Sequence, residues 1–222
     1  MTTNARIMTA ASIVLLPTDA LVIIDIQNDF CPGGSLAVPC GDETIPVANR
    51  LARLFGTTIL TQDWHPAGHS SFASAYTGKA PFETTELAYG TQVLWTDHCV
   101  QGTPGAAFHP DLDVDAAQLV IRKGFRPGID SYSAFYENDK TTATGLAGYL
   151  RERGITRVFF VGLATDFCVA YSAEDAVRCG FEAFVVEDGC RGIDLNGSVA
   201  AAKDRLTAAG VRFITSTDII TA

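Results

Sequence analysis

The sequence predicts an α/β fold of the doubly wound kind, a three-layer α/β/α sandwich built on one parallel sheet. Short continuous apolar runs recur along the chain, which is typical of parallel strands buried on both faces. Segments with apolar residues at helical spacing separate most of these runs, and such alternation produces right-handed βαβ units. The 222 residues, of which 47% are hydrophobic and 18% charged, are enough to bury one sizeable core.

The first half of the chain supplies three of the expected strands and one helix. Residues 20–25 form an apolar run that ends in an aspartate, and residues 43–55 place apolar side chains at helical spacing. Residues 57–61 and 118–122 are short segments rich in β-branched and aliphatic residues, which favours strands.

The second half alternates regularly between helix and strand. Each expected helix is followed by a glycine, which is the residue that most often ends a helix. The expected elements are, in chain order, helix 141–153, strand 157–161, helix 166–179, strand 181–186, helix 196–209 and strand 211–215.

Residues 63–117 interrupt this alternation, because they contain no convincing helix or strand of ordinary length. All four histidines (65, 69, 98 and 109) and both tryptophans (64 and 95) lie in this stretch. A loop of this length within a compact domain usually has a function. We therefore expect a metal and substrate excursion from a single domain that spans residues 19–222.

Residues 1–18 precede the first expected core strand. Their apolar stretch superficially resembles a weak secretory signal, but no small-residue cleavage site stands before Pro17. Cleavage beyond that point would cut into the first strand. We therefore expect an N-terminal extension, with Met8 as another possible start of the chain.

The composition excludes several classes of partner. Acidic residues exceed basic ones by nine (25 against 16) and no lysine or arginine cluster stands out, so a nucleic-acid surface is not expected. No apolar run approaches the ~20 residues that span a membrane. The six cysteines form no Cys-x-x-Cys pair, which indicates reduced thiols and a cytoplasmic location.

Polar and reactive side chains follow four of the expected strands. Asp25, Asp63 and Lys123 end the first three strands, and the fourth strand leads into the segment that carries Cys168. In open α/β sheets, ligands bind beyond the carboxyl ends of the strands. We therefore expect these four side chains to meet at one edge of the sheet.

Cysteine chemistry is one interpretation of this edge. Cys168 falls in the first turn of an expected helix, where unpaired N–H groups and the helix dipole stabilise a thiolate or an oxyanion. A lone cysteine is more commonly a small buried apolar residue. An aspartate beside a lysine and a cysteine, as Asp25 would be beside Lys123, can accept the thiol proton and later return it. A structural ion pair explains the same spacing equally well.

A divalent metal is the second interpretation. Asp63 and His65 have the i, i+2 spacing that turns two side chains to one side of an extended chain. This pair suits a borderline ion such as zinc, iron or manganese. His69, Ser71 and His98 are further candidates. One Asp-x-His pair is a weak signal, but three histidines near one strand end favour a metal site.

Five segments resemble, in order, the motifs of nicotinamidases, a group of isochorismatase-like cysteine hydrolases. They are residues 22–38 (VIIDIQNDFCPGGSLAV), 62–72 (QDWHPAGHSSF), 95–110 (WTDHCVQGTPGAAFHP), 122–124 (RKG) and 161–169 (VGLATDFCV). The similarity extends from about residue 20 to the carboxyl end. Five motifs in the same order make the resemblance specific.

The resemblance implies a six-stranded parallel sheet in the order 3-2-1-4-5-6. It implies a catalytic triad of Cys168, Asp25 and Lys123. It also implies an oxyanion hole formed by the backbone N–H groups of Ala164 and Cys168, with a cis peptide bond at Leu163–Ala164.

The resemblance further implies one divalent ion, zinc in the first place and iron or manganese as alternatives. Asp63, His65 and His98 would bind it. Ser71 stands where part of the family has another histidine ligand, and it would bind directly or through water. His69 is the second choice because it is out of register with that position.

A substrate pocket and a reaction follow from the same resemblance. The implied pocket residues are Phe30, Trp95, Tyr132, Gln27 and Leu163. The implied reaction converts nicotinamide, and pyrazinamide, to the acid and ammonia through a thioester on Cys168. The partner is then a small pyridine carboxamide, and the chain acts as a monomer or a homo-oligomer. The alternatives are an amidase for a carbamoyl or ureide compound and a noncatalytic binding domain of the same fold.

Overall fold

A six-stranded sheet forms the centre of the computed structural model, which describes residues 12–221. All neighbouring strands are parallel, and their order is β6-β3-β2-β7-β8-β9. The strands are β2 (Asp19–Ile24), β3 (Thr57–Asp63), β6 (Leu119–Lys123), β7 (Arg157–Leu163), β8 (Glu182–Arg191) and β9 (Arg212–Ile214). Numbered by their position along the chain, these strands have the order 3-2-1-4-5-6. The predicted sheet order is therefore confirmed.

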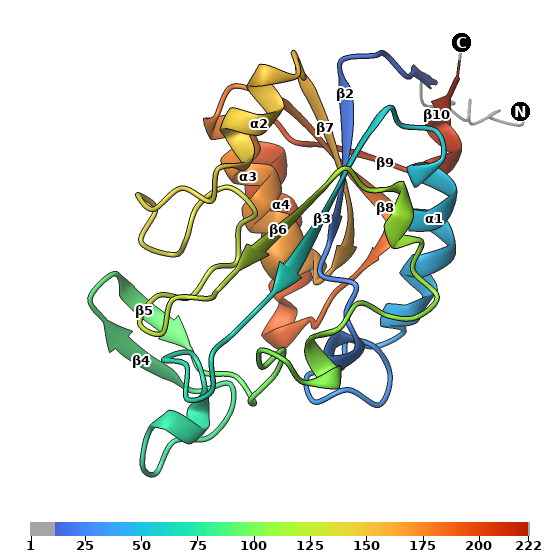
Figure 1. Cartoon of the computed structure of the whole chain (residues 1–222). Coiled ribbons are helices and arrows are strands. Elements are labelled where there is room, and N and C mark those ends of the chain that lie inside the picture. The colour runs from blue at the N-terminus through green and yellow to red at the C-terminus, as the bar shows by residue number, and fades with distance from the viewer. Residues whose placement is uncertain (1–11, 222) are drawn as a thin grey trace, which may run out of the picture.

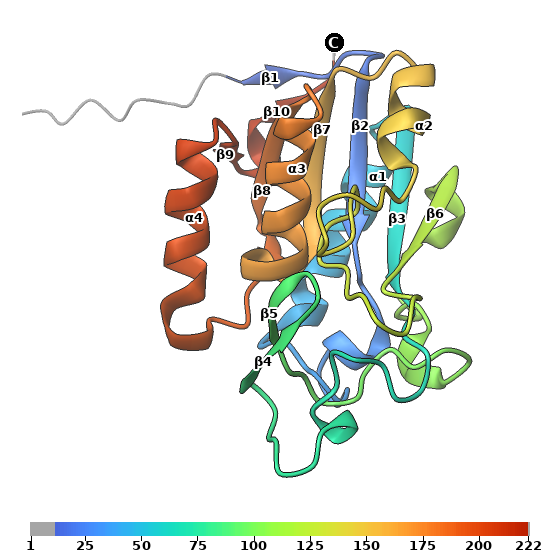
Figure 2. The same cartoon turned by 90° about the vertical axis from the view of Figure 1, so that its left-hand side faces the viewer.

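Helices cover both faces of the sheet. The helices are α1 (Ile45–Ala52), α2 (Leu146–Glu152), α3 (Ala170–Arg178) and α4 (Ser198–Ala208). In β2, Leu21 and Ile23 point to the face that α1 covers, whereas Val22 and Ile24 point to the face that α2, α3 and α4 cover. Figure 2 looks onto this second layer. Every residue of β2 is buried, as expected for a strand between two helical layers.

The predicted helices are longer than the observed ones at their N-terminal ends. Helix α2 begins at Leu146 rather than at residue 141, because Gly145 has a φ of 101°. The preceding residues form a turn in which the Asp139 carboxylate accepts hydrogen bonds from the backbone N–H groups of Thr141 and Thr142. Helices α1 and α4 each follow a short 3-10 helical segment, and α3 follows a π-helical one. The predicted helices included part of each of these segments.

Short helical segments occur between the main elements. They are η1 (Asn28–Phe30), η2 (Gly41–Thr44), η3 (Ala73–Ala75), η4 (Pro104–Ala106), η5 (Val114–Ala116), the π-helical η6 (Thr165–Val169), η7 (Leu195–Gly197) and η8 (Ser216–Asp218). No helix of residues 12–221 has both the length and the apolar character that a membrane span requires.

The predicted N-terminal extension falls partly within the folded structure. Residues 1–11 lie outside the described residues, but β1 (Ile13–Val14) pairs in parallel with β10 (Ile219–Ile220). The guanidinium of Arg157 donates to the carbonyl of Val14 at 2.8 Å, which ties β1 to the first residue of β7.

The excursion between β3 and β6 contains one hairpin that the sequence analysis missed. It consists of β4 (Thr84–Leu87) and β5 (Gly90–Val93), which pair antiparallel. Both strands are only four residues long and largely half-buried or exposed, so they lack a clear apolar alternation. Figure 1 shows the hairpin beyond the end of the sheet toward which the strand arrows point. The excursion therefore extends the edge at which the candidate residues lie.

Candidate active site

Lys123 is the centre of the buried cluster at the carboxyl edge of the sheet. Its Nζ lies 2.8 Å from Asp25 Oδ2 and 2.9 Å from Asp63 Oδ1, and it donates to Cys168 Sγ at 3.3 Å. All four residues are buried. The structure thus brings together the four side chains that the sequence placed at separate strand ends.

Asp25 follows β2 with a φ of 47°, a conformation that turns its side chain into the cluster. Its Oδ1 accepts a hydrogen bond from Thr61 Oγ1 at 2.6 Å. Although Lys123 Nζ forms an ion pair with Oδ2, no hydrogen bond among the described residues is directed at that oxygen. Burial raises the pKa of the Asp25 carboxyl, while Lys123 acts in the opposite direction. Oδ2 is therefore suited to accept a proton from a neighbouring thiol.

Cys168 is the fourth residue of the π-helical turn η6, which is separated from β7 only by Ala164. Burial raises the pKa of this thiol well above its usual range, although Lys123 lowers it. A helix N-terminus was expected to favour a thiolate at Cys168, but the cost of burying the charge is the larger effect here. The thiol therefore needs a proton acceptor before it can react as a nucleophile.

The backbone around Cys168 has the expected cis peptide bond, at Leu163–Ala164. Ala164 and Cys168 both line the same pocket. Gly162 precedes them with a φ of 115°, and a Cβ at this position would lie 2.1 Å from the carbonyl oxygen of Ile24. Only glycine fits where β7 passes so close to β2.

A second cluster, formed by Asp63, His65 and His98, has the chemistry of a metal site. All three are buried, and their ligand atoms lie within 4.8 Å of one another. Asp63 Oδ2 is 3.2 Å from His65 Nε2 and 3.4 Å from His98 Nε2. Burial acts to raise the pKa of Asp63, but Lys123 and His65 hold it well below its usual range. The cluster therefore presents a carboxylate and two imidazole nitrogens to one point.

Backbone carbonyls orient both imidazoles. His65 Nδ1 lies 2.8 Å from the carbonyl oxygen of Gly124, and His98 Nδ1 lies 2.7 Å from that of Thr96. In the tautomer that donates from Nδ1, each Nε2 keeps its lone pair for a cation. A Cβ at Gly124 would lie 2.4 Å from His65 Cε1, so this glycine makes room for the ring. The donor set thus fits a borderline divalent ion.

Ser71 and His69 are bonded to each other. His69 Nε2 lies 2.9 Å from the carbonyl oxygen of Arg126, and a proton on Nε2 leaves Nδ1 to accept from the Ser71 hydroxyl at 2.7 Å. The His69 ring also lies against His65, with centroids 4.4 Å apart. His69, His65 and Asp130 form another group of potential ligands, also within 4.8 Å of one another. Asp130 was not predicted from the sequence, because it lies seven residues after Lys123 on an irregular loop.

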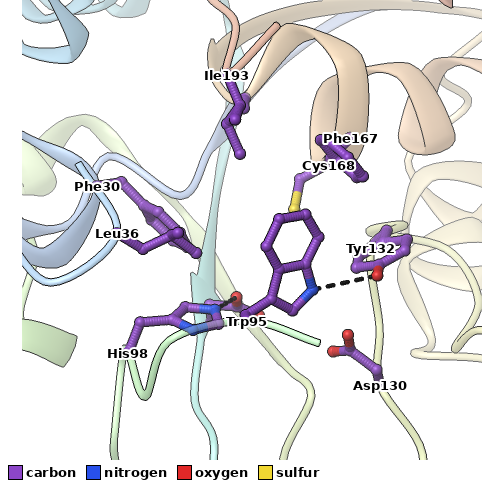
Figure 3. A pocket seen from close by; sticks show the side chains of 11 residues that line it. Phe30, Leu36, Trp95, His98, Asp130, Tyr132, Phe167, Cys168 and Ile193 are labelled. Atoms are coloured by element: carbon purple, nitrogen blue, oxygen red, sulfur yellow. Dashed lines mark hydrogen bonds and ion pairs between the residues drawn. The ribbon is translucent and has the colours of Figure 1, made fainter. Parts of the chain in front are cut away.

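A pocket of about 340 Å³, including space open to solvent, lies beside both clusters. Its lining residues are Phe30, Leu36, Asp63, Trp95, His98, Asp130, Tyr132, Ala164, Phe167, Cys168 and Ile193. Figure 3 shows the Trp95 indole among these side chains, with its N–H directed at the hydroxyl of Tyr132 at 3.2 Å. The pocket is thus mainly aromatic and aliphatic, with carboxylates, an imidazole and a thiol on its wall.

Three of the five predicted pocket residues line this pocket, namely Phe30, Trp95 and Tyr132. Gln27 and Leu163 lie outside the lining. The Gln27 amide is bonded to the backbone instead: Nε2 donates to the carbonyl of Asp63 at 2.8 Å, and Oε1 accepts from the N–H of Asp63 at 2.7 Å. Gln27 therefore fixes the backbone of a candidate metal ligand.

Asp29 supports the segment that carries His98. Its Oδ2 accepts a hydrogen bond from the N–H of Cys99 at 2.7 Å, and Cys99 has a φ of 46°. A Cβ at Gly105 would lie 2.1 Å from Asp29 Oδ2, so only glycine lets the chain pass this carboxylate. The 28–30 and 98–106 segments are thereby held together beside the pocket.

The chain is similar in sequence to known proteins over most of its length. The family model of the isochorismatase domain matches residues 19–218. The chain belongs to the isochorismatase family. In this family, the chain is similar to the nicotinamidase of Acinetobacter baylyi, at 55% identity over 90% of this chain and 94% of the relative.

Three solved structures share the fold of this chain. The nicotinamidase and pyrazinamidase of Acinetobacter baumanii matches with a TM-score of 0.90 and 59% identity, over 91% of this chain and 98% of that one. A protein of L. infantum in complex with nicotinate has a TM-score of 0.84 and 37% identity, with 95% and 100% coverage. The pyrazinamidase of Pyrococcus horikoshii in complex with zinc has a TM-score of 0.73 and 36% identity, with 90% and 99% coverage.

Proposed function

We propose that this isochorismatase-family chain hydrolyses nicotinamide, and pyrazinamide, to the corresponding acid and ammonia. The observation that carries the proposal is the position of Cys168, which borders an aromatic pocket and contacts Lys123, the ion-pair partner of Asp25. The names of the relatives support the same substrate, since they are nicotinamidases at 55% and 59% identity.

The pocket fits a flat heteroaromatic ring with one carboxamide. Phe30, Trp95 and Phe167 offer ring faces and edges for the apolar part of such a substrate. Asp63 and His98 line the part of the pocket where the ring nitrogen of the substrate would lie. Cys168 lies across the pocket from His98, where the carboxamide would lie. The complex of a relative with nicotinate, the product of this reaction, supports this assignment.

In the proposed reaction, Asp25 Oδ2 accepts the proton of the Cys168 thiol, and the sulfur attacks the carboxamide carbon. The backbone N–H groups of Ala164 and Cys168 stabilise the oxyanion. Asp25 then gives the proton to the departing nitrogen, ammonia leaves, and a thioester remains on Cys168. Asp25 next takes a proton from water, whose oxygen attacks the thioester carbon and releases the acid while the thiol regains its proton.

Lys123 has the proposed role of keeping both charged partners in place. Its ammonium lies between Asp25 and Asp63 and lowers the cost of a negative charge on the Cys168 sulfur. Burial acts to lower the pKa of Lys123, but Asp25 and Asp63 raise it well above its usual range. Lys123 therefore stays a cation throughout the reaction.

We further propose that Asp63, His65 and His98 bind one divalent ion. The converging Asp63 Oδ2, His65 Nε2 and His98 Nε2 atoms support this proposal, as does the zinc complex of the Pyrococcus relative. Zinc is the first choice, and iron or manganese suits the same donors. Such an ion supplies a Lewis acid that attracts the pyridine nitrogen.

We also propose that residues 19–222 form a single domain with an excursion at 63–117. The chain would act as a monomer or a homo-oligomer in the cytoplasm. The cysteine pattern of the sequence supports the location, since reducing compartments keep thiols free.

An ammonia-release assay tests the proposed function directly. We expect turnover with nicotinamide and pyrazinamide and much slower turnover with carbamoyl and ureide compounds of similar size. Release of ammonia from a carbamoyl compound alone would contradict the proposal and favour the alternative amidase.

A further inference from the structure

The loop that follows β8 brings Ile193 to the pocket on an irregular backbone. Asp194 and Asn196 have φ angles of 55° and 53°, and Gly197 has one of 83°. Among non-glycine residues, aspartate and asparagine adopt this left-handed conformation most readily. The backbone angles give the loop its path, and contacts from elsewhere in the fold keep Ile193 at the pocket.

The buried carboxylate of Asp166 makes these contacts. Its Oδ1 accepts a hydrogen bond from the N–H of Ile193 at 3.0 Å. Its Oδ2 accepts one from the N–H of Asp194 at 2.9 Å and another from the hydroxyl of Ser198. Asp166 is only 4% exposed, so these bonds are shielded from water.

The same carboxylate lies on the turn that carries Cys168. Asp166 is the second residue of η6 and Cys168 is the fourth, so the two side chains share one helical turn. Gly192 lets the loop approach this turn, because a Cβ there would lie 2.4 Å from Val199 Cγ2 and 3.3 Å from Asp166 Oδ1. Asp166 thus joins the turn of the proposed nucleophile to one wall of the pocket.

Ile193 is a branched aliphatic side chain at one end of that pocket. Figure 3 shows it on the side of Cys168 and Phe167, across the pocket from His98 and Asp130. A fixed aliphatic wall beside the reacting group excludes ring substituents that would overlap with it. A wall that can move away admits them and holds a small ring less tightly.

We infer that Asp166 is a positioning residue that sets the size of ring the pocket accepts, through its hold on Ile193. The inference rests on the proposed hydrolysis of nicotinamide. Asp166 touches neither substrate nor the reacting atoms in this scheme. Asp166 therefore affects how tightly the substrate binds and which rings the pocket accepts. It does not affect the activation of Cys168.

Three variants test this inference. Asp166→Asn keeps the shape of the side chain but replaces one acceptor oxygen with an NH2 group, which cannot accept a hydrogen bond from the backbone N–H. Ile193→Ala shortens the side chain that forms the wall. Ser198→Ala removes only one hydrogen bond to the Asp166 carboxylate. For Asp166→Asn and Ile193→Ala we expect KM for nicotinamide to rise about five-fold, the effect of losing one such contact, while kcat changes less. Ser198→Ala shifts KM in the same direction by a smaller factor.

Ring discrimination is the second readout. The ratio of kcat/KM for nicotinamide to that for a ring-methylated nicotinamide falls about ten-fold in Asp166→Asn and Ile193→Ala, the amount that one methyl-sized contact contributes. In the double variant, Asp166→Asn adds little to Ile193→Ala, because both act on the same wall. Calorimetric titration of nicotinamide into the Cys168→Ala background measures the loss of affinity without turnover.

Asp188→Asn is the matched control. Asp188 braces the segment Ser216–Asp218 in the same way, with Oδ1 accepting from the N–H of Ser216 at 2.7 Å and Oδ2 from its hydroxyl, but neither residue lines the pocket. We expect a lower Tm in this variant with unchanged KM and ring discrimination.

The outcomes separate this inference from the proposed function. Wild-type protein that releases no ammonia from nicotinamide overturns the function itself. Active wild type, with KM and discrimination unchanged in Ile193→Ala and Ser198→Ala, overturns the role of Asp166. These two variants decide the matter even where Asp166→Asn does not fold. Additive effects of Asp166→Asn and Ile193→Ala in the double variant also contradict the inference, since Asp166 would then act on a part of the site other than Ile193.

Discussion

Thr61 and Asp25 exchange two hydrogen bonds from neighbouring strands of the sheet. The Thr61 hydroxyl donates to Asp25 Oδ1 at 2.6 Å, and the backbone N–H of Asp25 donates to the same hydroxyl at 3.1 Å. This reciprocal contact fixes the plane of the carboxylate. As a result Oδ1 is occupied, and Oδ2 remains for Lys123 and for the proton of Cys168.

Replacing this hydroxyl tests its role. Thr61→Val has nearly the same volume but cannot donate to Asp25, so we expect kcat to fall roughly ten-fold, the value of one hydrogen bond to a charged group, with little change in KM. Thr58→Val, in the same buried strand, is the control for the change of side chain. Steady-state kinetics on both variants provide the measurement, and an unchanged kcat in Thr61→Val would refute the orienting role.

Asp25→Asn keeps the shape of the side chain and removes the proton acceptor. We expect turnover to fall roughly 10²- to 10⁴-fold, the usual contribution of a general base. Burial raises the pKa of the Cys168 thiol, which therefore needs Asp25 as its proton acceptor, so alkylation of that thiol at neutral pH should also be slower in Asp25→Asn. Mass spectrometry of alkylated Cys168 gives this rate. Turnover that survives in Asp25→Asn would leave Asp25 a structural ion pair with Lys123.

Cys168→Ala removes the proposed nucleophile. We expect no measurable turnover, while nicotinamide binding and metal content stay close to wild type, because the sulfur contributes little to either. Cys190→Ala is a suitable control, since Cys190 is also buried and burial raises its pKa to about 12. Retained activity in Cys168→Ala, or its loss in Cys31→Ala, would place the nucleophile elsewhere.

The metal proposal has its own test, based on elemental analysis after dialysis. His98→Ala and Asp63→Asn each remove a direct donor. Both should lower metal affinity by more than the roughly 10- to 100-fold that loss of an outer partner costs. Ser71→Ala should have a smaller effect, because its hydroxyl already donates to His69. His109→Ala is the control, since His109 lies outside both groups of candidate ligands. Metal lost only in His69→Ala would show that the other histidine group binds it.

Asp139 gives a prediction for stability against pH. Desolvation acts to raise the pKa of this carboxyl, but the bonds from Thr142 and Thr141 prevail and lower it to about 2. A group whose pKa falls on folding stabilises the fold above its unfolded pKa of about 3.9 and loses that effect as the pH drops toward the folded value.

Asp139→Ala should therefore lower the Tm at pH 7, and the difference from wild type should narrow between about pH 4 and pH 2. Thermal melts across this range measure the difference. Asp204→Ala, on the exposed side of α4, should show little difference at any pH. If the difference in Tm between wild type and Asp139→Ala stays constant down to pH 2, the proposed origin of the lowered pKa is contradicted.

The strands of the sheet could be predicted because their information is local. Runs such as residues 20–25 are apolar without a break, and the same runs end in Asp25, Asp63 and Lys123, whose meeting point follows from the geometry of any parallel sheet. The prediction of the buried cluster around Lys123 needed only these strand ends. The fold class and sheet order followed from the same runs together with the family resemblance.

What could not be predicted depends on contacts between distant segments. Ile193 and Asp130 reach the pocket on loops whose paths are set by partners far along the chain, such as Gln92, whose amide donates to Asp130 Oδ2 at 2.8 Å. The N-terminal end of α2 was predicted too early because the Asp139 turn competes with helix there. The strands of the hairpin β4–β5 are largely exposed or half-buried. Their sequences therefore show only a weak alternation of apolar and polar residues.

The pairing of β2 with β7 has a consequence for how the chain folds. These strands lie side by side from Asp19, which pairs with Arg157, to Ile24, which pairs with Gly162. Contacts between segments so distant in sequence form slowly, because a long loop must close first. During synthesis, β2 can therefore pair with β7 only after most of the chain has been made. Asp25 and Cys168 come together only at that late step, so no N-terminal folding intermediate can hold the complete site.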